Sequence, residues 1–273
     1  MAGTEKLAKS KLWPYYNLHD VPEGKIVLRI MEHDDFPVAQ AVEEIVALTH
    51  AAARSAAQDD PVWVHASRVA DAIHMLSMHT KHNEQSKLLE FVLSLEQVTI
   101  RDPQTGDMFK LDKACFWTDM PELSMTQAEY FESHSSTEDS GDTVEYHENA
   151  LAFFAQLSEA GFLGYKESIG RDYNDLMRLI DKKGHLSKLE VRVMCMWFIY
   201  APEKVWLDVQ LRRDYRGSHF PADSWLKWKQ FFQACQSAPG EEVKDEDTQQ
   251  LIKQALENME KVGAKEDLEL SSE

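Results

Sequence analysis

Four histidines lie close together in the chain and are the first group that could do chemistry. They are His65, His74, His79 and His82. Imidazole is the commonest protein ligand for transition metals. Residues five apart on a helix diverge by about 140°, however, so His74 and His79 cannot share one ion. His79 and His82 are suitably spaced, but no Glu-x-x-His motif completes a site. The spacing therefore predicts histidines on a helix surface or at helix ends, and it predicts neither a metal nor another cofactor.

Histidine also lies beside carboxylates in two short segments, residues 33–35 (HDD) and 145–148 (EYHE). Acid–base catalysis needs such groups to converge, but adjacent residues on a helix do not face each other. Both segments are therefore predicted to be exposed to solvent. Cys195 lies in an apolar run, which disfavours the thiolate that a nucleophile requires. No G-x-S-x-G, H-E-x-x-H, Walker-type or G-x-G-x-x-G motif is present, so the sequence leaves open whether the protein is an enzyme.

Tryptophan rings are the other group that could bind a ligand. Trp225, Trp228 and Phe232 are spaced by three and four, which places three rings on one face of a helix. Such a stripe is typical of a buried core contact, and the alternative is a platform on which a ligand stacks. If a pocket lies between the helices, we expect tryptophans and two polar residues to line it: Trp117, Trp197, Trp206, Trp225, Trp228, Arg171 and His79.

The elements that would position these residues are nearly all helices. Apolar residues recur at spacings of three and four after Asp35, after Asp60 and after Asn83, which predicts helices near residues 37–49, 61–80 and 83–99. Ser187 and Glu190 fit a capping box ahead of the most apolar helix, near residues 188–201. Further helices are predicted near 151–161, 173–180 and 221–232. The chain is thus predicted to be all-α, a bundle of roughly eight to ten helices in one or two layers.

Acidic residues concentrate outside the predicted core. Residues 129–148 hold seven acids and few apolar side chains, which predicts a flexible loop near 132–145. This loop would divide a helical domain at 31–240, with an N-terminal extension at 1–30 before it and an acidic amphipathic tail at 241–273 after it. Within the tail, Ile252, Ala255, Leu256 and Met259 recur at helical spacing. The tail either docks on the body or lies open for a protein partner.

Charge and cysteine content argue against several partners and compartments. The chain has 47 acidic and 29 basic residues, a net charge of −18, and no basic stripe of the kind that binds nucleic acid. Its three cysteines form no disulfide pattern, which favours the reducing cytoplasm or nucleus. The N-terminus lacks a secretory signal, and the longest strongly apolar stretch, residues 193–201, is too short to span a membrane. We therefore expect neither secretion nor membrane insertion.

Five segments, taken in order, resemble a family of filamentous-fungal proteins known as a domain of unknown function. They are residues 82–95 (HNEQSKLLEFVLSL), 116–121 (FWTDMP), 149–162 (NALAFFAQLSEAGF), 192–201 (RVMCMWFIYA) and 224–232 (SWLKWKQFF). The resemblance implies a helical fold and a fungal source, often near specialised-metabolism genes, and it transfers no active site. Pro202 stands where the family tends to have glycine, so the turn after the most apolar helix should differ.

Two functions from different classes remain open at this point. The first is a non-enzymatic helical interaction or scaffold protein, favoured by the acidic appendages and the missing catalytic motifs. The alternative is a helical enzyme or a small-molecule-binding accessory protein, with specialised metabolism as one setting. An enclosed cavity of about 300 Å³ or more with convergent polar groups would favour the alternative.

Overall fold

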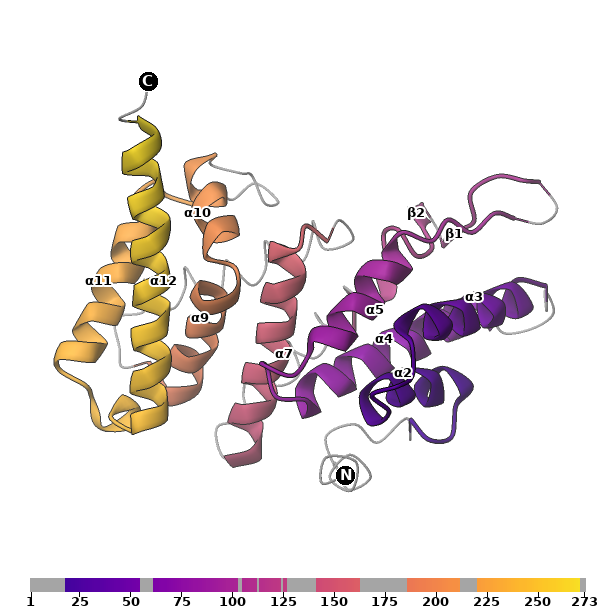
Figure 1. Cartoon of the computed structure of the whole chain (residues 1–273), viewed down its shortest axis with the longest axis horizontal. Coiled ribbons are helices and arrows are strands. Elements are labelled where there is room, and N and C mark those ends of the chain that lie inside the picture. Colours follow the sequence, from indigo (N-terminus) through magenta and orange to yellow (C-terminus); the bar gives the residue numbers. More distant parts are fainter. Residues whose placement is uncertain are drawn as a thin grey trace. The chain divides into compact units, whose positions relative to one another are not determined.

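The computed structural model describes residues 18–54, 61–102, 105–111, 113–123, 125–126, 141–162, 186–211 and 220–270. Helices dominate these residues, and one short antiparallel strand pair interrupts them (Figure 1). The predicted all-α class is therefore confirmed. The described residues form two compact units, and the division between them falls inside one helix, between Phe153 and Phe154. The predicted domain limits at residues 30 and 240 remain predictions.

The first unit is built mainly from helices that follow one another closely in the chain. Its helix α2 contacts the next three helices, and α3 and α4 also contact each other. Their bounds are α2 (Pro22–Glu32), α3 (Val38–Arg54), α4 (Pro61–His79) and α5 (Ser86–Glu96), followed by the N-terminal part of α7 (Gly141–Glu159). The first three predicted helices, with starts near residues 37, 61 and 83, thus correspond to α3, α4 and α5, and α5 begins three residues later than expected.

Helix α2 has no counterpart among the predicted helices. Its apolar residues Ile26, Val27, Leu28 and Ile30 are all buried, and Ile30 follows Ile26 and Val27 at spacings of four and three, while Lys25 and Glu32 are exposed on the other face. Gly24 permits a close packing contact at the start of this helix, because a Cβ atom there would lie 2.3 Å from the carbonyl oxygen of Leu18. The helix is therefore amphipathic, with one broad buried face and one exposed charged face.

A small hairpin connects the helical parts of the first unit. Strand β1 (Lys110–Leu111) pairs with β2 (Ala114–Cys115) in antiparallel register, and Arg101 forms an isolated bridge with Met108. The chain then enters residues 116–121, the FWTDMP segment, where Phe116, Trp117 and Met120 are buried. The hairpin thus delivers two aromatic rings into the core of the first unit.

The second unit contains the most apolar helix at its centre, as its sequence predicts. Its elements are α9 (Lys188–Tyr200), α10 (Pro202–Gln210), α11 (Ser224–Ser237), a 3₁₀ turn η2 (Glu241–Val243) and α12 (Glu246–Leu270). The predicted capping box is present: the Ser187 hydroxyl accepts from the Glu190 amide at 3.2 Å, and the Ser187 amide donates to the Glu190 carboxylate at 2.8 Å. Pro202 directly begins α10, so no glycine turn separates it from α9.

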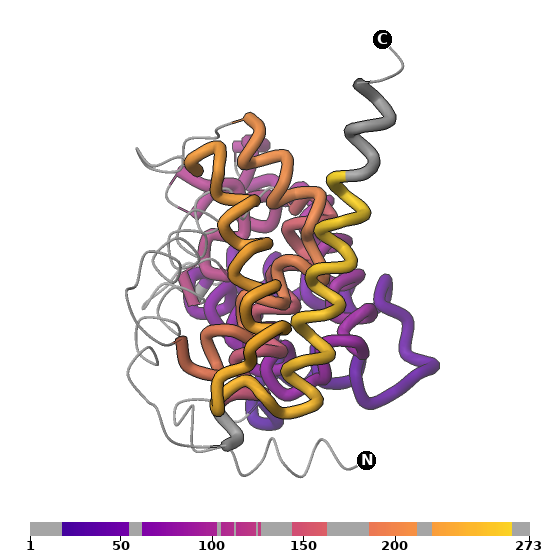
Figure 2. Tube along the Cα trace, turned by 90° about the vertical axis from the view of Figure 1, so that its left-hand side faces the viewer, coloured from indigo at the N-terminus to yellow at the C-terminus, as the bar shows by residue number. Residues whose placement is uncertain are grey.

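The acidic tail forms a helix that docks on its own unit. Helix α12 lies along α9 and α11 (Figures 1 and 2), and it also contacts α10. The predicted stripe of Ile252, Ala255, Leu256 and Met259 is buried there. Of the two alternatives for the tail, the docked one is observed, and the stripe from Ile252 to Met259 is not open to a partner.

Two predictions about residues 132–148 are wrong. Helix α7 begins at Gly141, so the last part of the predicted loop is helical; residues 127–140 lie outside the described part of the chain. His147 and Glu148, predicted to be exposed, are only 5% and 4% accessible. The acidic composition concealed a helical pattern, because Val144, His147 and Leu151 follow each other at spacings of three and four.

Candidate functional site

A buried chain of polar side chains connects three helices and the FWTDMP segment of the first unit. A carboxylate oxygen of Glu23 (α2) lies 2.8 Å from Nδ1 of His65 (α4), and Nε2 of His65 lies 3.0 Å from the hydroxyl of Thr49 (α3). The Trp117 indole N–H donates to the same hydroxyl at 3.1 Å. Carboxylate, imidazole and hydroxyl in this order form the arrangement of a hydrolase triad. The question is whether this triad can reach a substrate.

The Thr49 hydroxyl, at one end of this row of polar side chains, is buried and already hydrogen-bonded. Thr49 is 0% exposed, His65 3% and Glu23 5%. The Thr49 hydroxyl donates its single proton to the Ile45 carbonyl, at a distance of 2.9 Å. The threonine oxygen also accepts from the Trp117 indole N–H and lies within hydrogen-bond distance of Nε2 of His65. Because the hydroxyl is buried and its proton is already bound to the Ile45 carbonyl, this arrangement is a structural link between helices rather than a catalytic one.

The environment of Glu23 fits this role as a charged structural link. Burial by itself would raise the pKa of Glu23, but the hydrogen bond and charge of His65 outweigh it, with smaller help from the Glu23 amide and from the charge of Arg68. The pKa is therefore lowered below the ordinary value of 4.5. The carboxylate is ionised at neutral pH and holds α2 to α4 through a charge-assisted hydrogen bond.

A second set of buried amides fastens the end of α4 to α7. The Gln85 side-chain amide donates to the carbonyls of Ser77, Thr80 and Asn149 at 2.8, 3.0 and 2.9 Å. The Asn149 side chain donates to the Met78 carbonyl at 3.0 Å and accepts from the main-chain N–H of His82, also at 3.0 Å. These bonds satisfy carbonyls that the C-terminus of α4 leaves unpaired. The set is a helix-end clamp, and it contains no group placed for chemistry.

The residues predicted to line a pocket fall into both compact units. Trp117 and His79 belong to the first, where Trp117 is buried and the ring of the half-buried His79 lies 4.5 Å from that of Tyr146. The other tryptophans belong to the second unit, and Arg171 lies outside the described residues. A single pocket formed by all of them stays a prediction.

In the second unit the rings pack against one another. The Phe198 ring contacts Trp225, Trp228 and Phe232 at centroid distances of 5.6, 5.4 and 5.4 Å. Trp206 is half-buried and lies 4.9 Å from Trp225. Trp197 and Trp228 are completely buried. The aromatic stripe of α11 is therefore a core contact and not a platform on which a ligand stacks.

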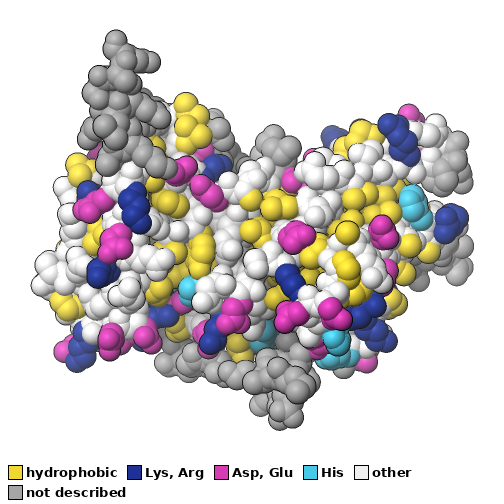
Figure 3. Space-filling view, viewed as in Figure 1, with side chains coloured by type: hydrophobic (Ala, Val, Ile, Leu, Met, Phe, Trp, Pro, Cys, Tyr) yellow, Lys and Arg dark blue, Asp and Glu magenta, His cyan; other side chains and the backbone are white. Residues whose placement is uncertain are grey.

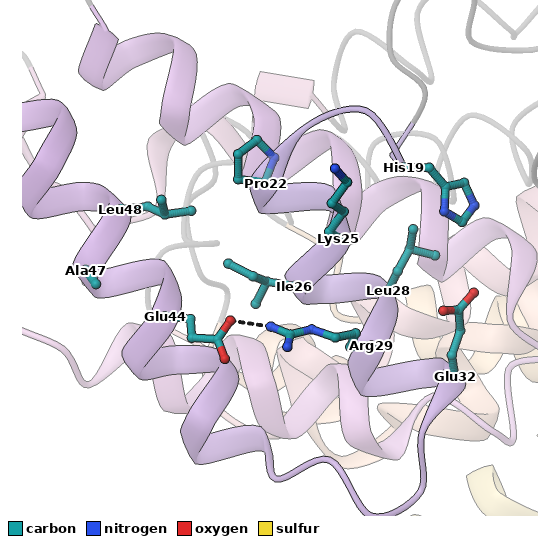
Figure 4. Close-up of a pocket in the computed structure, with 10 residues that line it drawn as sticks. All are labelled: His19, Pro22, Lys25, Ile26, Leu28, Arg29, Glu32, Glu44, Ala47 and Leu48. Carbon is teal, nitrogen blue, oxygen red and sulfur yellow. Dashed lines mark hydrogen bonds and ion pairs between the residues drawn. The ribbon is translucent and has the colours of Figure 1, made fainter.

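A groove on the surface of the first unit is the feature best suited to binding. It has a volume of about 680 Å³, is open to solvent, and lies along α2 and α3 (Figure 4). It is lined by apolar and charged side chains: His19, Pro22, Lys25, Ile26, Leu28, Arg29, Glu32, Glu44, Ala47 and Leu48. Sequence reasoning missed this groove because it missed α2, which supplies most of its wall.

The charged residues of the groove differ in how they are paired. Arg29 forms an ion pair with Glu44 across the groove, and its guanidinium lies 4.4 Å above the Phe36 ring. Lys25 and Glu32 are exposed, and neither forms an ion pair with any residue that the structure describes. The groove therefore offers one cation and one anion to an incoming group.

Metal binding and membrane insertion find no support in the described residues. Within them, no group of three or more His, Cys, Asp and Glu side chains is arranged to hold a metal ion. Among the same residues, no helix has the length and apolar character needed to cross a membrane. On the face shown in Figure 3, acidic side chains lie among basic ones instead of forming one patch.

Comparison with known proteins identifies the family. A family model described as a protein of unknown function (DUF3632) matches residues 71–261, which is well over half of the chain. The chain belongs to the DUF3632 family. No curated protein and no solved structure matches it. The DUF3632 match includes the Gln85 and Asn149 clamp and the whole aromatic core, whereas α2 and α3, which form the groove, precede it.

Proposed function

We propose that the protein is a non-enzymatic interaction protein that binds a segment of a partner protein in the groove between α2 and α3. The observation that carries this proposal is the groove itself, which is open to solvent and combines apolar side chains with charged ones. Open grooves of this kind accept amphipathic helices or extended peptides, whereas enzymes typically enclose their substrates.

The lining of the groove suits a mixed polar and apolar segment. Pro22, Ile26 and Leu48 offer apolar surface along it, and an apolar anchor of the partner would gain most of its binding energy there. Lys25 and Glu32 would select the partner by charge and fix its register rather than supply affinity.

The buried polar chain supports a non-enzymatic role. Glu23, His65 and Thr49 are the described residues closest to a catalytic triad, but all three are used to hold α2 and α3 against α4. Because α2 and α3 are also the walls of the groove, the same bonds keep the groove in shape. We infer that this polar chain serves binding by preorganising the two helices.

A partner capture experiment with two arginine variants tests the proposal. Ala47 lines the groove and is exposed on α3, so Ala47→Arg fills the groove without entering the core. Ala51 is equally exposed one turn further along α3 but is not part of the lining, which makes Ala51→Arg the matched control. The full-length chain is used as bait in extracts of its source organism. We expect a stoichiometric partner with the wild type and with Ala51→Arg, and its loss with Ala47→Arg at unchanged thermal stability. Recovery of the partner with Ala47→Arg would contradict the proposal.

A small-molecule-binding accessory role is the second candidate. The volume of about 680 Å³ favours it, because small-molecule sites occupy about 300–1,000 Å³. Under this alternative, a metabolite of the source organism would raise the melting temperature of the wild type and of Ala51→Arg but not of Ala47→Arg. This shift would be seen with purified protein alone, which separates the two candidates.

We also propose that the protein acts in the cytoplasm or nucleus and does not bind nucleic acid directly. All three cysteines, Cys115, Cys195 and Cys235, are free thiols, as expected in a reducing compartment. The net charge of −18 disfavours contact with phosphate backbones. Since α12 is docked on α9, partner binding is assigned to the groove rather than to the tail.

A further inference from the structure

Two exposed charges on α2 are placed so that the helix is complementary to itself. Lys25 and Glu32 are seven residues apart, which is two helical turns, so both lie on one face and about 10 Å apart along the axis. Neither is neutralised by a residue that the structure describes. Arg29, which lies between them, is already paired with Glu44 and held over Phe36. The exposed face of α2 therefore presents a cation at one end, an anion at the other, and a neutralised centre.

This pattern restricts which segment can fill the groove. A uniformly basic segment would be repelled by Lys25, and a uniformly acidic one by Glu32. A matching segment carries an acid and a base about 10 Å apart, so that its acid faces Lys25 and its base faces Glu32. An antiparallel copy of α2 meets this condition, because reversing the helix places its Glu32 opposite Lys25 and its Lys25 opposite Glu32. A two-fold axis produces both contacts at once.

We propose that the occupant of the groove is helix α2 of a second copy of this chain, in an antiparallel, two-fold symmetric dimer. This inference rests on the proposed function, since it takes the groove to be a protein-binding surface and names its partner. The dimer contains two such ion pairs, and each copy contributes one charge to each pair. The net charge of −18 on each copy opposes association at long range, so the dimer exists in a concentration-dependent equilibrium with the monomer.

A charge exchange on the full chain tests the dimer. Lys25→Glu alone turns both contacts into repulsion between acids, and Glu32→Lys alone turns both into repulsion between bases. Sedimentation velocity over a concentration series should show a dimer dissociation constant at least about tenfold higher for each single variant. The double variant Lys25→Glu/Glu32→Lys again places opposite charges against each other, and it should restore the wild-type value to within about threefold.

Controls make each outcome decisive. Ala47→Arg should abolish the dimer and Ala51→Arg should leave it unchanged, while circular dichroism checks that all variants fold. A wild type that stays monomeric at every concentration overturns the dimer, and so does a dimer that the single charge variants do not weaken. A double variant that does not restore the wild-type dissociation constant also overturns the dimer. If the protein is monomeric but Ala47→Arg still loses a partner from extracts, the proposed function stands and only the identity of the occupant is wrong.

Discussion

Both compact units bury many apolar side chains, but they differ in the group of side chains that joins their helices. In the first unit, the side chains of Glu23, Thr49 and His65 are buried and joined by hydrogen bonds. In the second, the centre is a cluster of rings around Phe198 that make no such bonds to one another. Hydrogen bonds between buried groups depend on distance and angle, whereas apolar packing depends mainly on area and shape. The polar chain of the first unit therefore fixes where α2, α3 and α4 lie, and the ring cluster stabilises the second unit mainly through buried surface.

This difference corresponds to where binding is proposed. The groove lies between α2 and α3, the helices that the polar chain holds in place. Buried polar groups add little net stability, but an unmade bond is costly, so alternative packings of these helices are disfavoured. In the second unit the completely buried Trp228 indole N–H has no hydrogen-bond partner among the residues that the structure describes, and burial of its large ring must offset this cost.

Truncating Trp228 should have the largest effect on stability. Trp228→Ala removes a completely buried ring, and we expect the free energy of unfolding of the second unit to fall by about 3–5 kcal/mol. Leu226→Ala on the same helix is the control, because Leu226 is 55% exposed and its removal should cost less than about 0.5 kcal/mol. Native-state hydrogen exchange measures the two units separately, and the loss of protection should be concentrated in α9, α11 and α12. A loss of equal size in α2–α4 would mean that the two cores are one cooperative system and that the comparison is wrong.

Replacing Thr49 should have a smaller effect, confined to the first unit. Thr49→Val keeps the side-chain shape but leaves the His65 and Trp117 N–H groups without their acceptor, and we expect a loss of about 1–3 kcal/mol. Thr49→Ser retains the hydroxyl and serves as the control. Denaturant unfolding measures the loss of stability, and hydrogen exchange shows whether that loss is confined to α2 and α3. If the valine variant is as stable as the wild type and still binds in the groove, the polar chain does not fix the position of these helices.

The second unit was predictable from sequence because its signals are local. The capping box of Ser187 and Glu190 spans four residues, and the stripe of Ile252, Leu256 and Met259 repeats within two turns. Both depend on contacts between near neighbours in the chain, so they can be read before any tertiary structure is known.

The candidate site could not be predicted in the same way, because its contacts are distant in sequence. His65 is 42 positions from Glu23 and 16 from Thr49, and no motif connects them. Only the position of Glu23 in the first turn of a helix gives a local signal, and that helix was itself missed, although Ile26, Val27 and Ile30 recur at spacings of three and four. The charge pattern of Lys25 and Glu32 was readable at a spacing of seven, but only once α2 was known to be a helix.

The smallest expected effect is a difference between the two units in acid. For a carboxyl group with a lowered pKa in the folded state, the stabilisation is complete above the unfolded-state pKa and is lost as the pH falls through the folded-state value. The stabilisation that Glu23 contributes is therefore complete above about pH 4.5 and is lost as the pH falls below that value. In the second unit, burial opposes ionisation of Asp245, but Lys188 at 3.0 Å and Thr248 lower the pKa of Asp245 below 3.8. Glu23→Gln should therefore remove acid sensitivity from α2 and α4.

Asp245→Asn should act on α12 alone and only weakly. Asparagine can still cap the helix through Thr248, so the variant isolates the charge, and the side chain is 38% exposed, so solvent screens its pair with Lys188. We expect a loss of about 0.2–1 kcal/mol that disappears in high salt, whereas the effect of the buried Glu23 should persist in salt. The pH dependence of hydrogen exchange at low and high ionic strength measures both. Equal salt sensitivity would show that the Glu23 link is accessible to water and that the polar core of the first unit is less closed than its geometry indicates.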